Sequence, residues 1–219
     1  MDIRIITTQD GSHSLFRQDV NEHFHSTFGA IQESKHIYIQ AGLDAVIKEE
    51  IRVFELGYGT GLNALLTCLR GKESGKKICY YSIDKYPVPP EILVKLNYSE
   101  ILCPETPELY KSMCDSEWEK TLTLGDFALT KIKSDMLDYV IPFNIDLVYY
   151  DAFSPEREPG LWSEALFKKV YDAMNIGGVL VTYCAKGDVR RQLISSGFTV
   201  EKLKGPPGKL HILQAVKLS

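Results

Sequence analysis

The amino-acid sequence predicts an α/β protein with a mainly parallel sheet that helices cover on both faces. From Ile51 onward, apolar strands alternate with helical segments, which is the pattern of successive βαβ units. The last two strands are joined by a Gly-Pro turn over 205–208, too short for a parallel crossover, so one strand near the C-terminus should run antiparallel. The 219 residues, 44% of them hydrophobic and 25% charged, suffice for one domain with its own core.

The elements follow one another in a regular order. Up to about residue 42 we expect short strands and turns: strands over 3–7 and 14–19, then a polar stretch ending in 36–40. The expected core strands cover 51–56, 78–83, 145–150, 179–184, 198–203 and 210–216, with a hairpin of 121–124 and 128–132 across Gly125-Asp126. The expected helices cover 62–70, 163–174 and 188–196. A β-rich extension over 1–45 should therefore pack on a core domain over 46–219 as one compact unit.

Charge and cysteine content narrow the class of protein. The net charge is −4, but residues 180–219 carry +5 and the preceding residues −9, which permits an anion-binding face on an acidic chain. Five cysteines without a CxxC pair predict free buried thiols in a reducing compartment. No apolar run approaches the roughly 20 residues of a membrane span, and residues 1–11 lack a signal-peptide core, so we expect a cytoplasmic protein without membrane contact.

The strongest local signal is a glycine-rich turn between the first core strand and its helix. Gly57, Gly59 and Gly61 form G-x-G-x-G, and Glu55 stands two positions before the first glycine. Glycines let the backbone approach a ligand that a Cβ atom would block, and the following helix offers free N–H groups to an anion. The dinucleotide fingerprint G-x-G-x-x-G is absent, because its third glycine would stand at position 62, which is Leu62 here. The turn therefore predicts a ligand site of another kind.

Carboxylates follow three further strands. Asp84 ends the strand over 78–83, where a carboxylate can accept hydrogen bonds from both hydroxyls of a ribose. Asp135 ends the strand that follows the hairpin; it could accept from an adenine amino group, with Met136 beside the ring, and a solvated helix cap explains it equally well. Asp151 ends the strand expected beside the first one, so it should face the same crevice as the glycine turn.

The loop after Asp151 has the pattern Asp-x-Phe-x-Pro, with Phe153 and Pro155. It resembles the acidic, proline-containing loop with which amino-group methyltransferases hold the attacking nitrogen. Trp162 could add a stacking face for a planar substrate, and an apolar anchor at the start of the next helix explains it at least as well.

Two other polar groups carry weaker signals. Three of the four histidines of the N-terminal stretch lack a paired Cys or carboxylate at ligand spacing, so we expect no metal site; the four are His13, His23, His25 and His36. Cations follow late strand ends: Lys186, Arg190, Arg191 and Lys209. A solvated charged face and contacts with phosphate groups are equally good explanations of these cations.

Together these motifs resemble the MnmC-type methyltransferases, the S-adenosylmethionine-dependent enzymes that modify the wobble uridine of certain tRNAs. The resemblance rests on 54–63, 83–87, 146–155, 161–162 and 187–191, and it extends from Ser12 to Val216. Asp84 and Ser134-Asp135 stand where the family often has Glu and Gly-Asp, and both departures keep the carboxylate. In many bacteria this domain is fused to a flavin-dependent oxidoreductase, a partner domain that we expect this chain to lack.

The resemblance implies a Rossmann-like class I methyltransferase fold and methylation of 5-aminomethyl-2-thiouridine at the tRNA wobble position. Asp151 would hold the attacking amine and help to remove its proton. The implied contacts with the cofactor, S-adenosylmethionine, are Glu55, Gly57, Tyr58, Gly59, Gly61, Asn63, Asp84, Lys85, Asp135 and Met136. The implied contacts with the substrate, the anticodon arm of tRNA, are Phe153, Trp162, Lys186, Arg190, Arg191 and Lys209. Glu33 and Phe28 are further pocket candidates.

Other functions are less consistent with the sequence. An aminopropyltransferase of the spermidine-synthase kind would need an acidic pocket for a polyamine and no basic tail, and a dinucleotide-dependent oxidoreductase would need the absent fingerprint. An RNA-binding module without a cofactor would be expected to have lost Asp151 or a glycine. A methyltransferase acting on another amine remains the nearest alternative.

Overall fold

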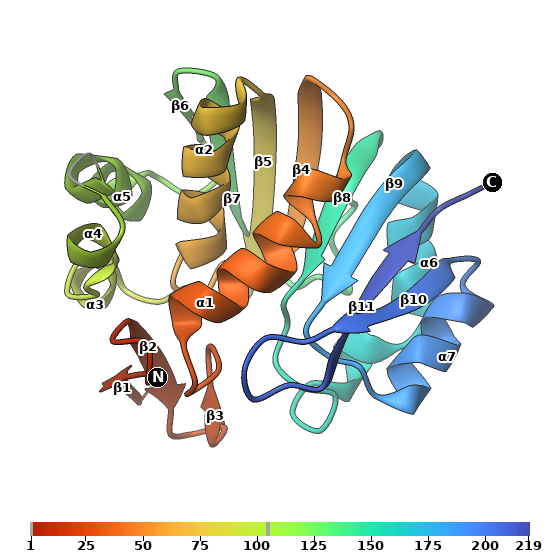
Figure 1. The fold of residues 1–219 in the computed structure, drawn as a ribbon, viewed down its shortest axis with the longest axis horizontal. Coiled ribbons are helices and arrows are strands. Elements are labelled where there is room, and N and C mark those ends of the chain that lie inside the picture. The colour runs from red at the N-terminus through yellow and green to blue at the C-terminus, as the bar shows by residue number, and fades with distance from the viewer. Residues whose placement is uncertain (1, 104–105) are drawn as a thin grey trace.

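The computed structural model describes residues 2–103 and 106–219, and within them an eight-stranded sheet forms the centre of the fold (Figure 1). The strand order is β10-β11-β9-β8-β4-β5-β7-β6. The parallel strands are β4 (Glu50–Leu56), β5 (Lys77–Asp84), β7 (Phe127–Lys133), β8 (Ile145–Tyr150) and β9 (Met174–Thr182). β11 (His211–Val216) runs antiparallel to both β9 and β10 (Thr199–Lys204), and β6 (Thr121–Leu124) forms the hairpin with β7. The predicted fold class, with its reversed strand near the C-terminus, is confirmed.

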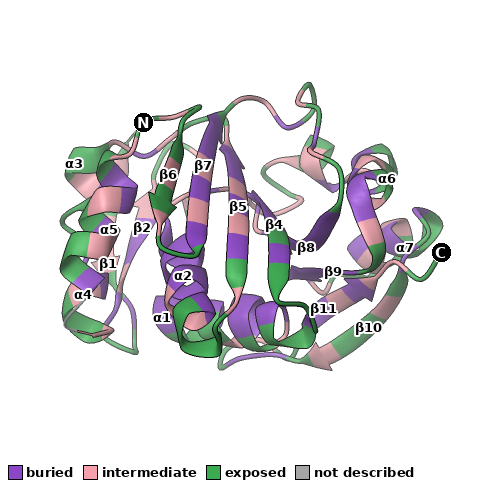
Figure 2. Ribbon diagram, turned by 90° about the horizontal axis from the view of Figure 1, so that it is seen from above, coloured by how far each residue is buried: buried purple, intermediate pink, exposed green. Residues whose placement is uncertain are grey.

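Helices cover both faces of this sheet, as its apolar strands require. Successive side chains of a strand point to opposite faces, so Leu147 and Tyr149 of β8 join one core and Val148 and Tyr150 the other. The first core contains residues of α1 (Ala30–Ser34), α2 (Leu62–Ser74) and α5 (Thr106–Asp115). The second contains residues of η3 (Pro159–Trp162), α6 (Glu164–Ala173) and α7 (Gly187–Ser195). Figure 2 shows buried residues along the central strands and exposed ones on β6 and β10 at the edges.

Three strands near the N-terminus form a separate antiparallel sheet: β1 (Ile3–Thr7), β2 (His13–Arg17) and β3 (Glu22–His23). This small sheet lies beyond the carboxyl ends of the parallel strands, below α1 and α2 in Figure 1. It confirms the β-rich N-terminal extension of the predicted fold. Because the ligand crevice of a parallel sheet opens at that same end, the extension can contribute side chains to it.

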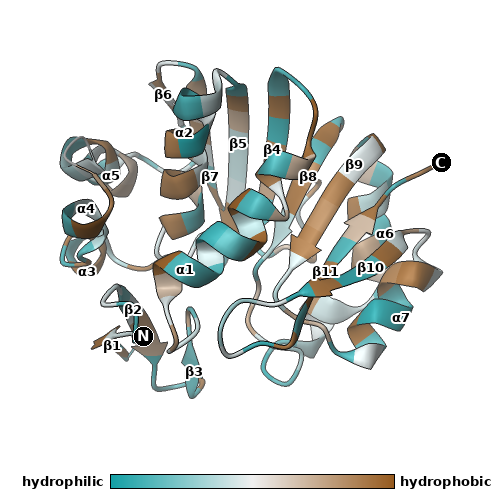
Figure 3. Cartoon of the chain, in the orientation of Figure 1, coloured by the Kyte–Doolittle hydropathy of each residue, from teal (hydrophilic) through white to brown (hydrophobic). Residues whose placement is uncertain are grey.

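The second half of the N-terminal stretch is helical, so the expectation of strands and turns up to residue 42 is wrong there. α1 continues directly into η1 (Lys35–Gln40), a wider π-helical segment, and η2 (Leu43–Ala45) follows. The alternation in 36–40 resembles a strand, but Ile37, Tyr38 and Ile39 are all buried, because η1 packs between α2 and β9. Figure 3 shows β9 as largely hydrophobic and the side of α1 that faces the viewer as largely hydrophilic. Tertiary packing decides the structure of this segment.

Short helices fill the segment between β5 and β6, for which the sequence suggested no element. They are α3 (Pro90–Leu93) and α4 (Tyr98–Ile101), which pack around α5 beside α2 (Figure 1). No helix among the described residues is both long and apolar enough to cross a membrane.

Candidate active site

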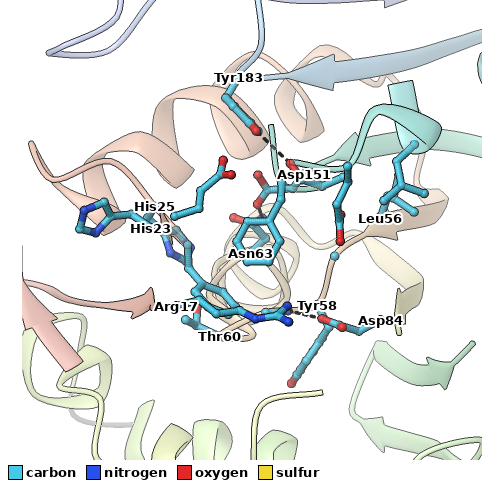
Figure 4. A pocket seen from close by; sticks show the side chains of 18 of the residues that line it. Arg17, His23, His25, Leu56, Tyr58, Thr60, Asn63, Asp84, Asp151 and Tyr183 are labelled. Atoms are coloured by element: carbon cyan, nitrogen blue, oxygen red, sulfur yellow. Dashed lines mark hydrogen bonds between the residues drawn. The ribbon is translucent and has the colours of Figure 1, made fainter. Parts of the chain in front are cut away.

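A cavity of about 620 Å³ opens at the carboxyl ends of the parallel strands. Its floor is the turn after β4, and its walls come from the residues that follow β5, β7, β8 and β9. The segment over 21–28, which links the small N-terminal sheet to α1, forms part of the wall. Figure 4 shows side chains from these separate parts of the chain pointing into one space. The sequence prediction that Gly57, Asp84 and Asp151 share a crevice agrees with this arrangement.

The glycine turn has a backbone that other residues would not tolerate. Gly57 has φ +93°, and a Cβ atom there would lie 2.6 Å from the backbone oxygen of Asp151. Gly59 has φ +51° and donates its N–H to Asp84 Oδ2 at 3.0 Å. Gly61 begins α2 rather than lining the cavity, and a Cβ atom there would lie 2.7 Å from Tyr58 Oη. Two of the three glycines thus leave bare backbone facing the cavity, and the third makes room for a buried tyrosine ring.

Glu55 lies beneath the cavity instead of lining it. Its carboxylate is fully buried and accepts hydrogen bonds from Asn63 Nδ2 at 3.0 Å and Ser82 Oγ at 2.6 Å. Burial outweighs these hydrogen bonds and raises the pKa of Glu55 to about 8. Asn63 lines the cavity and also donates to Asp151 Oδ2 at 2.9 Å. Glu55 therefore contributes to the site indirectly, by orienting Asn63. The sequence had suggested a direct contact between Glu55 and the cofactor.

Replacing Glu55 with Gln is expected to flatten the pH dependence of stability. The pKa of the Glu55 carboxyl is about 8 in the folded protein, against an ordinary value of 4.5, so the folded state binds more protons between these limits. The free energy of unfolding should fall as pH rises through this window, by at most about 1.4 kcal/mol per pH unit for this group. Urea unfolding between about pH 5 and pH 8 measures the slope. Glu108→Gln, at an exposed position of α5, should leave the slope as in the wild type. An unchanged slope in Glu55→Gln would show that Glu55 is ionised in the folded protein.

Two acidic residues continue the cavity along β5 and β7. Asp84 accepts from the N–H groups of Gly59 and Tyr86, and burial nevertheless raises its pKa. Asp135 is paired with Lys85 Nζ at 2.7 Å and accepts from the N–H of Leu137 at 3.0 Å. The hydrogen bond from Lys85 is the main cause of the lowered pKa of Asp135. Asp84, Lys85, Asp135 and Met136 all line the cavity, so the structure brings these predicted residues together.

Asp151 lines the cavity where β8 ends. Tyr38 Oη donates to its Oδ1 at 2.5 Å and Asn63 Nδ2 to its Oδ2, so both oxygens have fixed positions. Burial raises the pKa of Asp151 to about 8 against the opposing effect of these hydrogen bonds, and the nearby Glu33 adds to the rise. A carboxyl group with this pKa can exchange a proton near neutral pH.

The predicted substrate residues separate into two groups. Phe153 lines the cavity and packs edge-on against Phe24, with ring centres 5.2 Å apart. Lys209 also lines it, from the turn between β10 and β11. Trp162 does not: its indole is 2% exposed, packs on Tyr150 and donates to the Phe153 carbonyl at 2.7 Å. The structure therefore makes Trp162 the apolar anchor of the loop and corrects its place among the substrate contacts.

Three predicted cations lie away from the cavity, at the start of α7. Lys186 forms an ion pair with Glu156, and Arg191 forms one with Asp188. Arg190 lies between them in the sequence and is half-buried. None of these three side chains lines the cavity.

Several cavity residues escaped sequence reasoning because they come from the N-terminal extension or its helix. They are Arg17, Phe24, His25 and Tyr38, the last of which reaches the site through its hydrogen bond to Asp151. Figure 4 shows Arg17 extending toward Asp84, with His25 on the same side. Tyr183 follows β9 and could have been found by the rule that strand ends line the crevice. Among the described residues, no three His, Cys, Asp or Glu side chains gather as metal ligands would.

Known proteins resemble this chain in sequence and in fold. It is 27% identical over 201 residues to the tRNA 5-methylaminomethyl-2-thiouridine biosynthesis bifunctional protein MnmC of Paraburkholderia xenovorans, covering 83% of this chain and 30% of that protein. The same-named protein of Marinomonas sp. is 30% identical over 189 residues, covering 80% of this chain and 28% of the relative. The chain thus spans about a third of the length of these bifunctional relatives.

Solved structures confirm the fold. The crystal structure of MnmC2 from Aquifex aeolicus matches with a TM-score of 0.83 at 23% identity, covering 100% of this chain and 72% of the other. A spermidine synthase in complex with a transition state analogue matches with a TM-score of 0.58 at 12% identity, over 98% of this chain and 74% of the other. A family model described as S-adenosyl-L-methionine-dependent methyltransferase matches residues 95–218, more than half of the chain. The chain therefore belongs to the S-adenosyl-L-methionine-dependent methyltransferase family, with the MnmC-type methyltransferase domain as the member that its motifs predicted.

Proposed function

We propose that this methyltransferase transfers the methyl group of S-adenosylmethionine to the amine of 5-aminomethyl-2-thiouridine at the wobble position of tRNA. The observation that carries the proposal is the position of Asp151. Its carboxyl group shares a cavity with the glycine turn, and two hydrogen bonds fix its orientation. The name of the MnmC relatives refers to 5-methylaminomethyl-2-thiouridine, the product of this transfer, and supports the choice of substrate.

The residues present fit the cofactor. Gly57 and Gly59 leave backbone open to a ligand. A Cβ atom at Gly57 would meet the backbone of Asp151, and one at Gly59 would meet the ring of Phe24. Asp84 would accept hydrogen bonds from the ribose hydroxyls. Asp135 and Met136 would contact the adenine, and the methionine part would then lie over the glycine turn, next to Asp151. When bound there, the cofactor supplies an electrophilic methyl group.

The acceptor amine must lose a proton before it can attack, because such amines are largely protonated at pH 7. The pKa of Asp151, raised to about 8, lies close to that of an amine, so the ionised form of Asp151 can hold the ammonium and accept that proton without a large energetic mismatch. Tyr38 and Asn63 keep the carboxyl oriented, and the aromatic rings of Phe153 and Tyr183 line the same cavity. Orientation and desolvation of the amine then provide most of the rate acceleration.

The direct test is methyl transfer to RNA of defined chemistry. The purified protein would be incubated with S-adenosylmethionine carrying a labelled methyl group and with a synthetic anticodon stem-loop that contains 5-aminomethyl-2-thiouridine. We expect label in the wobble nucleoside, found by nucleoside mass spectrometry, and none in the stem-loop with unmodified uridine. Cofactor binding without incorporation would keep the family and exclude this substrate.

A polyamine is the second acceptor to test, because six carboxylates line the cavity: Glu22, Glu33, Asp84, Asp135, Asp151 and Glu158. An acidic cavity of this kind also suits putrescine. Incubation with putrescine and decarboxylated S-adenosylmethionine would reveal aminopropyl transfer, which we expect to be absent.

Because the proposed substrate is tRNA, we propose that the protein acts in the cytoplasm.

Removing cations at the start of α7 is expected to weaken RNA binding without affecting the cofactor. The double variant Lys186→Ala and Arg190→Ala should raise KM for tRNA by about 3- to 10-fold and reduce the salt dependence of binding by about one unit of slope per lost phosphate contact. S-adenosylmethionine affinity, measured by calorimetry, should stay unchanged. Lys111→Ala is the matched control, because Lys111 is also an ion-paired surface cation but lies on α5, at the opposite end of the sheet. Equal salt slopes in all three proteins would remove this face from the RNA-binding surface.

A further inference from the structure

Glu33 is a buried carboxylate of the cavity wall for which the proposed reaction gives no role. It lies on α1 with 7% of its surface exposed. Its Oε2 accepts the N–H of Ser26 at 2.7 Å, whereas its buried Oε1 accepts no hydrogen bond and has only an ion pair with Lys209, 3.4 Å away. A buried carboxylate oxygen that lacks a donor is costly unless a ligand supplies one. This oxygen therefore indicates an acceptor position for a cation or an N–H group in the cavity.

The position of Glu33 along the sheet shows whether it would contact the bound cofactor or the bound acceptor substrate. The strand order runs from β7 through β5, β4 and β8 to β9 and β11. Asp135 follows β7, Asp84 ends β5, and Asp151 follows β8, so the proposed cofactor contacts run in that direction toward Asp151. The neighbours of Glu33 lie further along: Lys209 precedes β11, and Tyr183 follows β9. Glu33 thus lies beyond Asp151, on the acceptor side.

A cation already occupies the space next to Glu33. The ammonium of Lys209 lies 3.4 Å from Glu33 Oε1 and 4.9 Å from the centre of the Tyr183 ring. A carboxylate and an aromatic face together are a favourable environment for an ammonium group. Lys209 is only partly buried and sits on the turn between β10 and β11, so its side chain can leave this position more easily than Glu33 can.

We propose that Glu33 is the specificity-determining residue for the charged amine: the ammonium of the substrate replaces that of Lys209 between Glu33 and Tyr183, next to Asp151. The proposal rests on the proposed function, since it assigns the recognition of the same aminomethyl group. Glu33 selects the charged group and Asp151 accepts the proton, so the two carboxylates have different tasks. A substrate with a neutral group in place of the amine would gain nothing from Glu33.

The test is a comparison of Glu33→Gln with the wild type on two stem-loop RNAs. Gln keeps a carbonyl oxygen for the N–H of Ser26 and removes only the charge. We expect KM for the stem-loop with 5-aminomethyl-2-thiouridine to rise about 10-fold or more, as befits a lost charge-assisted contact. The inhibition constant of the stem-loop with 5-hydroxymethyl-2-thiouridine should stay within about twofold, and so should the Kd of S-adenosylmethionine.

Two controls distinguish charge recognition from a structural effect. Glu33→Asp keeps the charge and should recover part of the preference for the amine, and thermal melting checks that both variants fold. Glu158→Gln removes a charge from the same cavity near Asp84 and Arg17, and it should leave the ratio of amine to hydroxyl binding unchanged.

The outcomes are separable. An inactive wild type on the amine RNA would overturn the proposed function and this proposal with it. An active wild type with the same preference in Glu33→Gln would overturn only this proposal. Weaker S-adenosylmethionine binding with unchanged RNA KM would overturn it as well, by assigning Glu33 to the amino group of the cofactor.

Discussion

Asp151→Asn is expected to lower kcat for methyl transfer by about 10²- to 10⁴-fold while the Kd of S-adenosylmethionine changes less than about threefold. The amide has the size of the carboxyl group. It can still accept from Asn63 through its oxygen and donate through its nitrogen to the hydroxyl of Tyr38, which works as donor or acceptor. The substitution therefore preserves the geometry and removes the proton acceptor. Single-turnover kinetics with the stem-loop RNA, beside calorimetry with the cofactor, measure the two quantities.

The pH dependence of the same variant separates proton transfer from positioning. In the wild type, the pKa of Asp151 is about 8 in the ligand-free protein, so activity should change across neutral pH as Asp151 and the amine titrate. The residual activity of Asp151→Asn should follow the ionisation of the amine alone. Tyr38→Phe is the positioning control: it keeps the carboxyl and removes the hydroxyl that fixes it, so kcat should fall less than in Asp151→Asn. A parallel loss of cofactor affinity and activity in Asp151→Asn would show that Asp151 holds the structure of the site together.

The sequence allowed prediction of the site where it depends on local rules. Gly57 and Asp151 directly follow strands, Asp84 ends one, and Asp135 comes two residues after one. Because parallel strands end at one edge of a sheet, their shared cavity could be inferred without coordinates. The hairpin of β6 and β7 was equally local, because Gly125-Asp126 specifies its turn. Their individual contacts with cofactor and substrate stay predictions.

The remainder depends on long-range packing that no local pattern records. Tyr38 reaches Asp151 only because η1 is a helix laid across the sheet, and the alternation of its sequence suggested a strand. Arg17 enters the cavity because the small sheet folds over the strand ends. Trp162 had two explanations of similar weight, and only its burial against Tyr150 decides between them.

Gly57→Ala is expected to raise the Kd of S-adenosylmethionine by about 100-fold or abolish binding. An alanine at φ +93° is strained, and its Cβ would lie 2.6 Å from the backbone oxygen of Asp151. The turn cannot yield easily, because the N–H of Gly57 bonds to the Ile83 carbonyl and the N–H of Asp151 to the Leu56 carbonyl. The collision must therefore push the ends of β4 and β8 apart. This movement would displace both the glycine turn and Asp151.

Alanine substitutions at two further glycines give a graded series, in which calorimetry measures the Kd of S-adenosylmethionine for each variant. Gly125→Ala has a comparable φ of +62° but no atom within 4 Å of the added Cβ, so it should cost stability and leave cofactor binding intact. Gly59→Ala would bring its Cβ to 3.1 Å from the Phe24 ring, a side chain that can shift, so its effect should be intermediate. If Gly57→Ala and Gly125→Ala weakened binding equally, general destabilisation would explain both. A loss of cofactor affinity that is largest for Gly57→Ala, smaller for Gly59→Ala and absent for Gly125→Ala would instead show that the cofactor needs backbone contact at the turn.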